Sequence, residues 1–185
     1  LPHTNAGVLS AREMAALRDV SVSQGLMLET LAPSVGRPGG AHFGCRTKEP
    51  AARLRQLELA GRLRVPFTTG LLLGLGETRA DTIDALLAIR RLHARFGHVQ
   101  EVIVQPFRAK QGTRLEASPD YPESELLWAV CAARCRLRLE SAELGLGLTT
   151  ANAPRSRRRR THTHCCARPH RHRHRPSPRR CHRAP

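Results

Sequence analysis

The chain has 185 residues, enough for one domain with a hydrophobic core but hardly for two. Its formal net charge of +16 suggests a nucleic-acid binder, but this charge is unevenly distributed. The first 154 residues hold 17 arginines, two lysines and all fifteen acids, a net charge of only +4, whereas residues 155–185 hold twelve arginines and no acid. No apolar run approaches the ~18 residues of a membrane span, and six scattered cysteines indicate a reducing, cytoplasmic setting rather than a disulfide framework.

Helix and strand signals alternate along the first 140 residues. Ser10 and Glu13 form a capping box, and Thr78 can cap a second helix with the help of Asp81. Pro50 occupies a favoured first helical position, and Gly61 and Gly97 are typical of helix ends. We expect, in chain order, a helix over 10–19, a strand over 21–28, a loop over 31–47, a helix over 50–61, a strand over 65–73, a helix over 78–95, a strand over 99–105 and a helix over 123–139.

Such an alternation, with short connections, predicts an α/β fold with a parallel sheet and right-handed crossovers. Three strands are too few to close a barrel. The fold is therefore expected to be a consecutive arc of a (β/α) barrel or half of an open sheet.

The composition changes after residue 150. Residues 155–185 consist mainly of Arg, His, Pro and Cys without apolar periodicity, so we expect a folded domain over 1–150 and a disordered basic tail over 151–185. This amino-acid composition is also what GC-rich codons yield when they are translated out of frame. The tail suggests an alternative, non-enzymatic function, in which it binds nucleic acid or metal non-specifically.

The most informative segment is the end of the strand over 65–73. An apolar run, residues 71–73, leads into Gly74 and Gly76, where a ligand or another backbone can approach closely, and then to Glu77. Parallel α/β proteins build their sites where strands end in this way. A purely structural strand–helix link is the alternative.

Five strings, in this order, resemble one family: the radical S-adenosylmethionine (SAM) enzymes that form the deazaflavin chromophore FO. They are LPHTNAGVLS at 1–10, GLMLET at 25–30, AGRL at 60–63, PFTTG with GLGET within 66–78, and GHVQEVIVQ followed by FRAK within 97–110. The resemblance covers residues 1–140. It implies a partial (β/α) TIM-like barrel of the radical SAM type, of which this chain is the C-terminal arc.

The resemblance also implies roles for particular residues. SAM would be bound by Glu29, Gly70, Leu72, Gly74 and Glu77. The substrate would be bound by Thr68, Thr69, Gln105, Arg108 and Lys110. Because Glu29 and Glu77 end neighbouring strands, we expect their carboxylates to face one shared cavity.

The implied reaction is the closure of the 5-deazaflavin ring, with loss of ammonia, in coenzyme F420 biosynthesis. Its substrate is the adduct of a 4-hydroxybenzyl group with 5-amino-6-(ribitylamino)uracil. The implied cofactors are SAM and a 4Fe–4S cluster. The implied partner is a companion 4-hydroxybenzyl transferase subunit or domain.

The sequence departs from the family in ways that affect this function. The family holds its cluster on a C-x3-C-x2-C loop, which would lie upstream of Leu1 and is absent. Cys131 and Cys135 imitate half of that spacing but fall within an expected helix, where we expect small core residues rather than metal ligands. Pro106 replaces an asparagine at a substrate position. We therefore expect no metal site and an inactive fragment.

Overall fold

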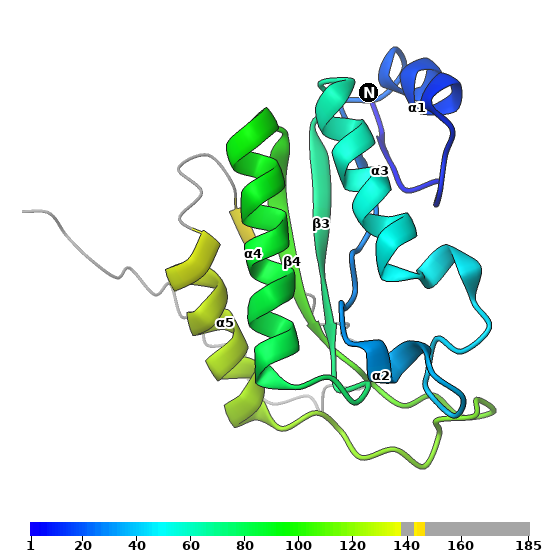
Figure 1. Cartoon of the computed structure of the whole chain (residues 1–185), viewed down its shortest axis with the longest axis vertical. Coiled ribbons are helices and arrows are strands. Elements are labelled where there is room, and N and C mark those ends of the chain that lie inside the picture. Colours follow the sequence, from blue (N-terminus) through cyan, green and yellow to red (C-terminus); the bar gives the residue numbers. More distant parts are fainter. Residues whose placement is uncertain (138–142, 147–185) are drawn as a thin grey trace, which may run out of the picture. The chain divides into compact units, whose positions relative to one another are not determined.

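The computed structural model describes residues 1–137 and 143–146, and within this part the chain forms one parallel α/β unit (Figure 1). The five strands pair in the order in which they occur in the chain: β1 (His3–Thr4), β2 (Ser23–Gly25), β3 (Phe67–Leu73), β4 (Val99–Pro106) and β5 (Glu143–Leu146). The strand order does not reverse as it does in a doubly wound sheet. Each strand instead pairs with the next one in the chain, an order that is compatible with part of a (β/α) barrel. The predicted parallel α/β class is confirmed.

The helices are α1 (Ala11–Arg18), α2 (Pro33–Gly36), α3 (Pro50–Arg62), α4 (Arg79–Phe96) and α5 (Glu123–Leu137), with a 3₁₀ turn, η1 (Arg46–Lys48). Figure 1 shows α3, α4 and α5 along one side of the sheet, with α4 packed between the other two. The core lies between these helices and the strands. Its largest members include Phe67, Leu71, Leu57, Leu86 and Ile89.

The predicted starts of α1 and α4 are confirmed, since both capping boxes form. Thr78 Oγ1 accepts a hydrogen bond from the Asp81 N–H, and the Asp81 carboxylate accepts one from the Thr78 N–H. Gly97 ends α4 in the left-handed conformation, with φ of 66°.

The end predicted for α3 at Gly61 is wrong. The helix continues to Arg62, and Gly61 lies within its last turn. A Cβ at Gly61 would lie 2.6 Å from the Phe96 ring. This glycine therefore lets α3 approach α4 closely instead of ending the helix.

The strand predicted over 21–28 is shorter than expected, because β2 covers only Ser23–Gly25. The chain nevertheless stays beside β3: the Glu29 N–H donates to Gly70 O, and the Leu72 N–H donates to Glu29 O. Glu29 has a φ of 66°, which turns the chain away from the sheet there. β1, β5, α2 and η1 are additional to the predicted elements, which otherwise occur in the expected order.

The prediction that Cys131 and Cys135 are core residues is wrong, since both are exposed. The buried positions of α5 are Ala129, Ala133 and Leu137, four residues apart, so the cysteines fall on another side of the helix. The boundary expected at residue 150 and the expected disordered tail lie outside the described residues. None of the described helices combines the length and apolar character that crossing a bilayer requires.

Candidate functional site

Alternate side chains of β3 and β4 project from the face of the sheet opposite α3–α5, which we call the inner face. The pairs Thr68–Glu101, Gly70–Ile103 and Leu72–Gln105 stand opposite one another on it. A register shift between Phe67 and Thr68 gives β4 one surplus residue, Gln100. Toward the carboxyl ends of the two strands, the inner face therefore ends in Leu72 and Gln105.

A cavity of about 400 Å³ opens at this end of the sheet, and we call it the strand-end pocket. Its lining brings together four of the residues that the sequence had assigned to cofactor or substrate: Leu72, Gln105, Arg108 and Lys110. The other lining residues are Ala41, Pro106, Phe107, Thr113, Arg114 and Leu115. The lining contains three cationic side chains, one amide and no carboxylate.

The cations of the pocket differ in their partners. Arg108 Nη1 lies 2.5 Å from Asp120 Oδ2, and both side chains are largely exposed. Arg114 Nη2 donates to Gly40 O at 2.6 Å, which ties the loop after β4 to the loop before α3. Within the described residues, neither Lys110 nor Arg114 has an acidic partner.

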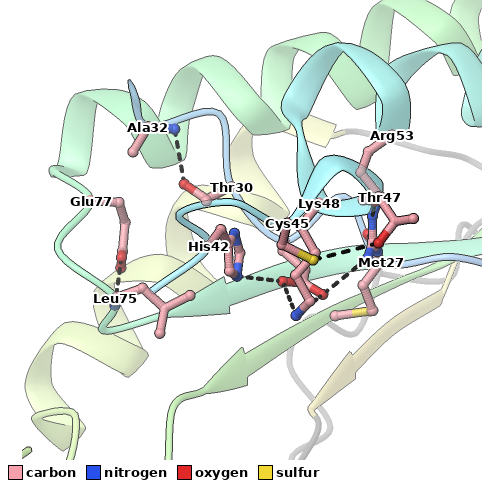
Figure 2. Close-up of polar contacts among 11 residues, drawn as sticks. Met27, Thr30, Ala32, His42, Cys45, Thr47, Lys48, Arg53, Leu75 and Glu77 are labelled. Carbon is pink, nitrogen blue, oxygen red and sulfur yellow. Dashed lines mark hydrogen bonds and ion pairs between the residues drawn. The ribbon is translucent and has the colours of Figure 1, made fainter. Parts of the chain in front are cut away.

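Glu29 lies in a different environment, which we call the Glu29 cluster. Its carboxylate is 12% exposed and lies 2.8 Å from His42 Nε2, 3.0 Å from Lys48 Nζ and 3.5 Å from Arg53 Nη2. Arg53 also donates to Met27 O and Thr47 O. Figure 2 shows His42, Lys48 and Arg53 gathered around this point. The carboxylate is thus fully engaged by one lysine, one arginine and one histidine of the protein itself.

His42 has a pKa below its ordinary value. Burial is the main cause, because a buried imidazolium loses its hydration. The Glu29 carboxylate opposes this shift, while the positive charges of Lys48 and Arg53 add to it.

Glu77 binds its own turn. The Gly74 and Leu75 N–H groups donate to its two carboxylate oxygens at 2.6 and 2.8 Å. In Figure 2, Glu77 points to Leu75 and lies apart from His42 and Lys48. Neither Glu29 nor Glu77 lines the strand-end pocket or the smaller pocket near His42, so neither of these two pockets is the cavity that the two carboxylates were expected to share.

The two glycines of this region serve close packing. Gly74 has a φ of 97°, and a Cβ there would lie 2.8 Å from the Tyr121 ring. A Cβ at Gly70 would lie 2.1 Å from Ile103 O on β4. Burial is the main cause that raises the pKa of Tyr121, so its phenol remains neutral against the glycine turn.

Thr68 and Thr69 point to opposite faces of β3. Thr68 is half-buried on the inner face, where its Oγ1 lies 3.4 Å from Glu101 Oε2. Thr69 is completely buried on the helix side, donating to Leu26 O and accepting from Leu28 N–H. Thr69 therefore does not reach the inner face, and its hydroxyl joins β3 to the segment after β2.

The described residues do not fit an iron–sulfur cluster. No group of three or more histidines, cysteines, aspartates or glutamates converges within 1–137. Cys45 lies before η1, whereas Cys131 and Cys135 lie on α5. A cluster needs several thiolates at one point.

Some residues of the site gave no signal in the sequence. Arg114 and Leu115 belong to an irregular loop, and the partners of Glu29 lie up to 24 residues away. The sequence could have indicated the Glu29 cluster only through the presence of lysine and histidine residues able to pair with this acid. Such residues are common on protein surfaces, so their presence does not point to a cluster.

These features define a class: a parallel α/β protein with a small-molecule pocket at the carboxyl ends of its strands. No family model matches the chain. It is 52% identical over 135 residues to FO synthase of Mycobacterium tuberculosis, covering 72% of this chain and 16% of that protein. It is 47% identical over 134 residues to 7,8-didemethyl-8-hydroxy-5-deazariboflavin synthase of Methanopyrus kandleri, covering 72% of this chain and 40% of that protein.

A similar match, with 50% identity over 134 residues, 72% of this chain and 39% of the relative, is the 7,8-didemethyl-8-hydroxy-5-deazariboflavin synthase of Synechococcus elongatus. The chain spans between 16% and 40% of the length of these curated relatives. The resemblance to the deazaflavin-forming enzymes is therefore confirmed: this chain is related to a segment of FO synthase.

Proposed function

We propose that this segment forms part of the catalytic barrel of a deazaflavin (FO) synthase and contributes the wall that binds the small-molecule substrate. The strand-end pocket carries this proposal, because it gathers Leu72, Gln105, Arg108 and Lys110 at the carboxyl ends of β3 and β4. The 52% identity to an FO synthase supports it.

The proposed substrate is the adduct of a 4-hydroxybenzyl group with 5-amino-6-(ribitylamino)uracil. The Gln105 amide offers both a donor and an acceptor for the edge of the pyrimidine. Leu72 and Phe107 offer apolar walls for the rings. Ring closure with loss of ammonia would give FO, the precursor of coenzyme F420, and a companion 4-hydroxybenzyl transferase would supply the benzyl group.

When bound to a reduced 4Fe–4S cluster, SAM supplies the oxidising radical chemistry of such enzymes. We derive no step through the cluster, because the described residues do not fit one.

For SAM, the family positions are Glu29, Gly70, Leu72, Gly74 and Glu77. The place of Leu72 in the pocket supports this role. Gly70 does not add to that support, because the space beside it is occupied by Ile103 O and the end of the Met27 side chain. The two carboxylates do not fit it as they stand, since Glu29 is held by three cationic or imidazole groups and Glu77 by its own turn.

The binding of FO tests the proposed pocket, because the deazaflavin ring is fluorescent and its anisotropy rises on binding. We expect saturable binding by the purified chain and a loss of roughly fivefold to tenfold in affinity for Gln105→Ala, as for a lost hydrogen bond of about 1 kcal/mol. Gln100→Ala is the matched control, since Gln100 is an exposed glutamine of the same strand. Equal losses in both variants, or no saturable binding, would contradict the proposal.

The catalytic state of this segment has its own test. We expect the purified chain, reconstituted with iron and sulfide and supplied with a reductant and SAM, to release no 5′-deoxyadenosine above background. Appreciable turnover, measured by chromatography, would refute the proposal that this segment alone is inactive.

A further inference from the structure

We propose that the strand-end pocket recognises an anionic group, a phosphate ester or a carboxylate, carried by a small molecule with a planar or apolar body. The proposal rests on the proposed function only in that it uses the same pocket. It goes beyond that function because the ribitylaminouracil adduct carries neither group, and SAM carries a carboxylate but no phosphate ester.

The charge of the pocket is the first observation. Three cationic side chains line a cavity of about 400 Å³ that contains no carboxylate. Asp120 engages Arg108 alone, and the described residues place no acid against Lys110 or Arg114. Two positive charges are therefore not neutralised by the pocket itself.

The loop after β4 is folded so that its acid does not neutralise these cations. Glu116 uses its carboxylate to accept a hydrogen bond from the Gly112 N–H at 2.7 Å. The Thr113 hydroxyl donates to Lys110 O at 2.7 Å and closes the turn between Lys110 and Arg114. Gly112, with a φ of 76°, allows the chain to reverse there. The fold of the loop thus brings two cations to the same cavity.

Arg114 is held in place from the opposite side. One of its terminal nitrogens donates to Gly40 O at 2.6 Å, next to Ala41 of the pocket lining. A guanidinium has five N–H donors in a fixed fork, so several remain for a ligand after this bond forms. An arginine oriented in this way suits bidentate binding of a phosphate or carboxylate.

The other lining residues indicate the chemical character of the part of the ligand that is not charged. Leu72, Phe107 and Leu115 supply apolar surface, and Gln105 supplies an amide. A bare inorganic ion would leave this surface unused. The pocket therefore fits a ring-bearing organic anion better than a free ion.

Riboflavin and its 5′-phosphate (FMN) form a matched pair of probes, because they share a planar ring and a ribityl chain and differ only in the phosphate. We expect FMN to bind the full chain at least tenfold more tightly than riboflavin. Both affinities are measured at low salt by the change in flavin fluorescence. The difference should shrink as the salt concentration rises. A riboflavin derivative that carries a carboxylate in place of the 5′-phosphate tells the two anions apart.

Arg114→Gln and Lys110→Gln should each weaken FMN binding by roughly tenfold to a hundredfold, as expected for a lost charge-assisted hydrogen bond of about 1.5–3 kcal/mol. For Arg114→Gln, riboflavin binding should change less than about twofold, a shift of under about 0.4 kcal/mol. Lys110→Gln is the variant less prone to misfold, because the Lys110 ammonium forms no hydrogen bond or ion pair with the described residues. Arg91→Gln, an exposed arginine of α4, is the matched control.

Tight binding of FMN alone assigns the site to phosphate, and tight binding of both anions assigns it to anions in general. Equal affinities for FMN and riboflavin, or the absence of FMN binding, would overturn the anion site. If FO still bound in those cases, the proposed function would stand without it.

Discussion

The strand-end pocket and the Glu29 cluster use the same kinds of side chain in opposite ways. In the cluster, His42, Lys48 and Arg53 surround one carboxylate that is 12% exposed, so both fixed cations have an anionic partner within the protein. In the pocket, Lys110 and Arg114 line a cavity without an acid. A cationic group near a strand end therefore indicates a ligand only where the fold has not already supplied the anion.

The largest effect is expected from removing the carboxylate of the cluster. Glu29→Gln would leave the charge of Arg53, whose side chain is 9% exposed, without its anion, and we expect a loss of roughly 3 kcal/mol in the free energy of unfolding. Urea denaturation measures it. Glu49→Gln, an exposed glutamate beside the cluster, should change the stability by less than about 0.5 kcal/mol. Equal effects of the two variants would mean that the cluster does not hold the fold.

A smaller effect is expected from pH. The pKa of His42 is lowered in the folded protein, chiefly by burial. The unfolded chain therefore binds a proton more readily, so this contribution to stability is complete above the unfolded value of about 6.5 and is lost as the pH falls through the folded pKa.

Urea midpoints at pH 7.5 and 5.5 test this expectation for the wild type and for His42→Gln. The wild type should lose more stability on acidification than the variant. An equal loss would assign the pH dependence elsewhere, for example to His98, whose pKa is also lowered by burial.

The smallest effect is expected at the edge of the pocket. Asp120→Asn removes the only described acidic partner of Arg108, but both side chains are more than half exposed. Such exposed pairs contribute little, so the stability should change by less than about 0.5 kcal/mol. In contrast, the affinity for FMN should rise, because Arg108 becomes a third cation without an anion. A stability loss comparable to that of Glu29→Gln would erase the distinction between the two regions.

The sequence could predict what depends on near neighbours in the chain. The capping box at Thr78 and Asp81 and the end of α4 at Gly97 involve residues at most a few positions apart, and both were predicted correctly. The opposite directions of Thr68 and Thr69 depend on which face of β3 the helices cover, which the run of apolar residues did not reveal. Because successive side chains of a strand point to opposite faces, the alternation could have shown only that Thr68 and Thr69 cannot both face the substrate.

The site was predictable in part for the same reason. Gln105, Arg108 and Lys110 follow the end of a strand, so the sequence could place them at one edge of the sheet. Which carboxylate remains free there depends on contacts between distant loops. Glu29 meets Lys48 and Arg53 only after the segment before α3 folds back, and Glu77 is captured by its own turn.

The surplus residue Gln100 decides which atoms the pocket presents. Had the strands continued in step from the pairing of Phe67 with Val99, Val104 would stand opposite Leu72, and Gln105 would stand opposite Leu73 among the core residues. The cavity would then be walled by a methyl group, and an amide would be trapped without water. A single irregularity near the start of β4 thus determines which side chain, five residues further along the strand, lines the cavity.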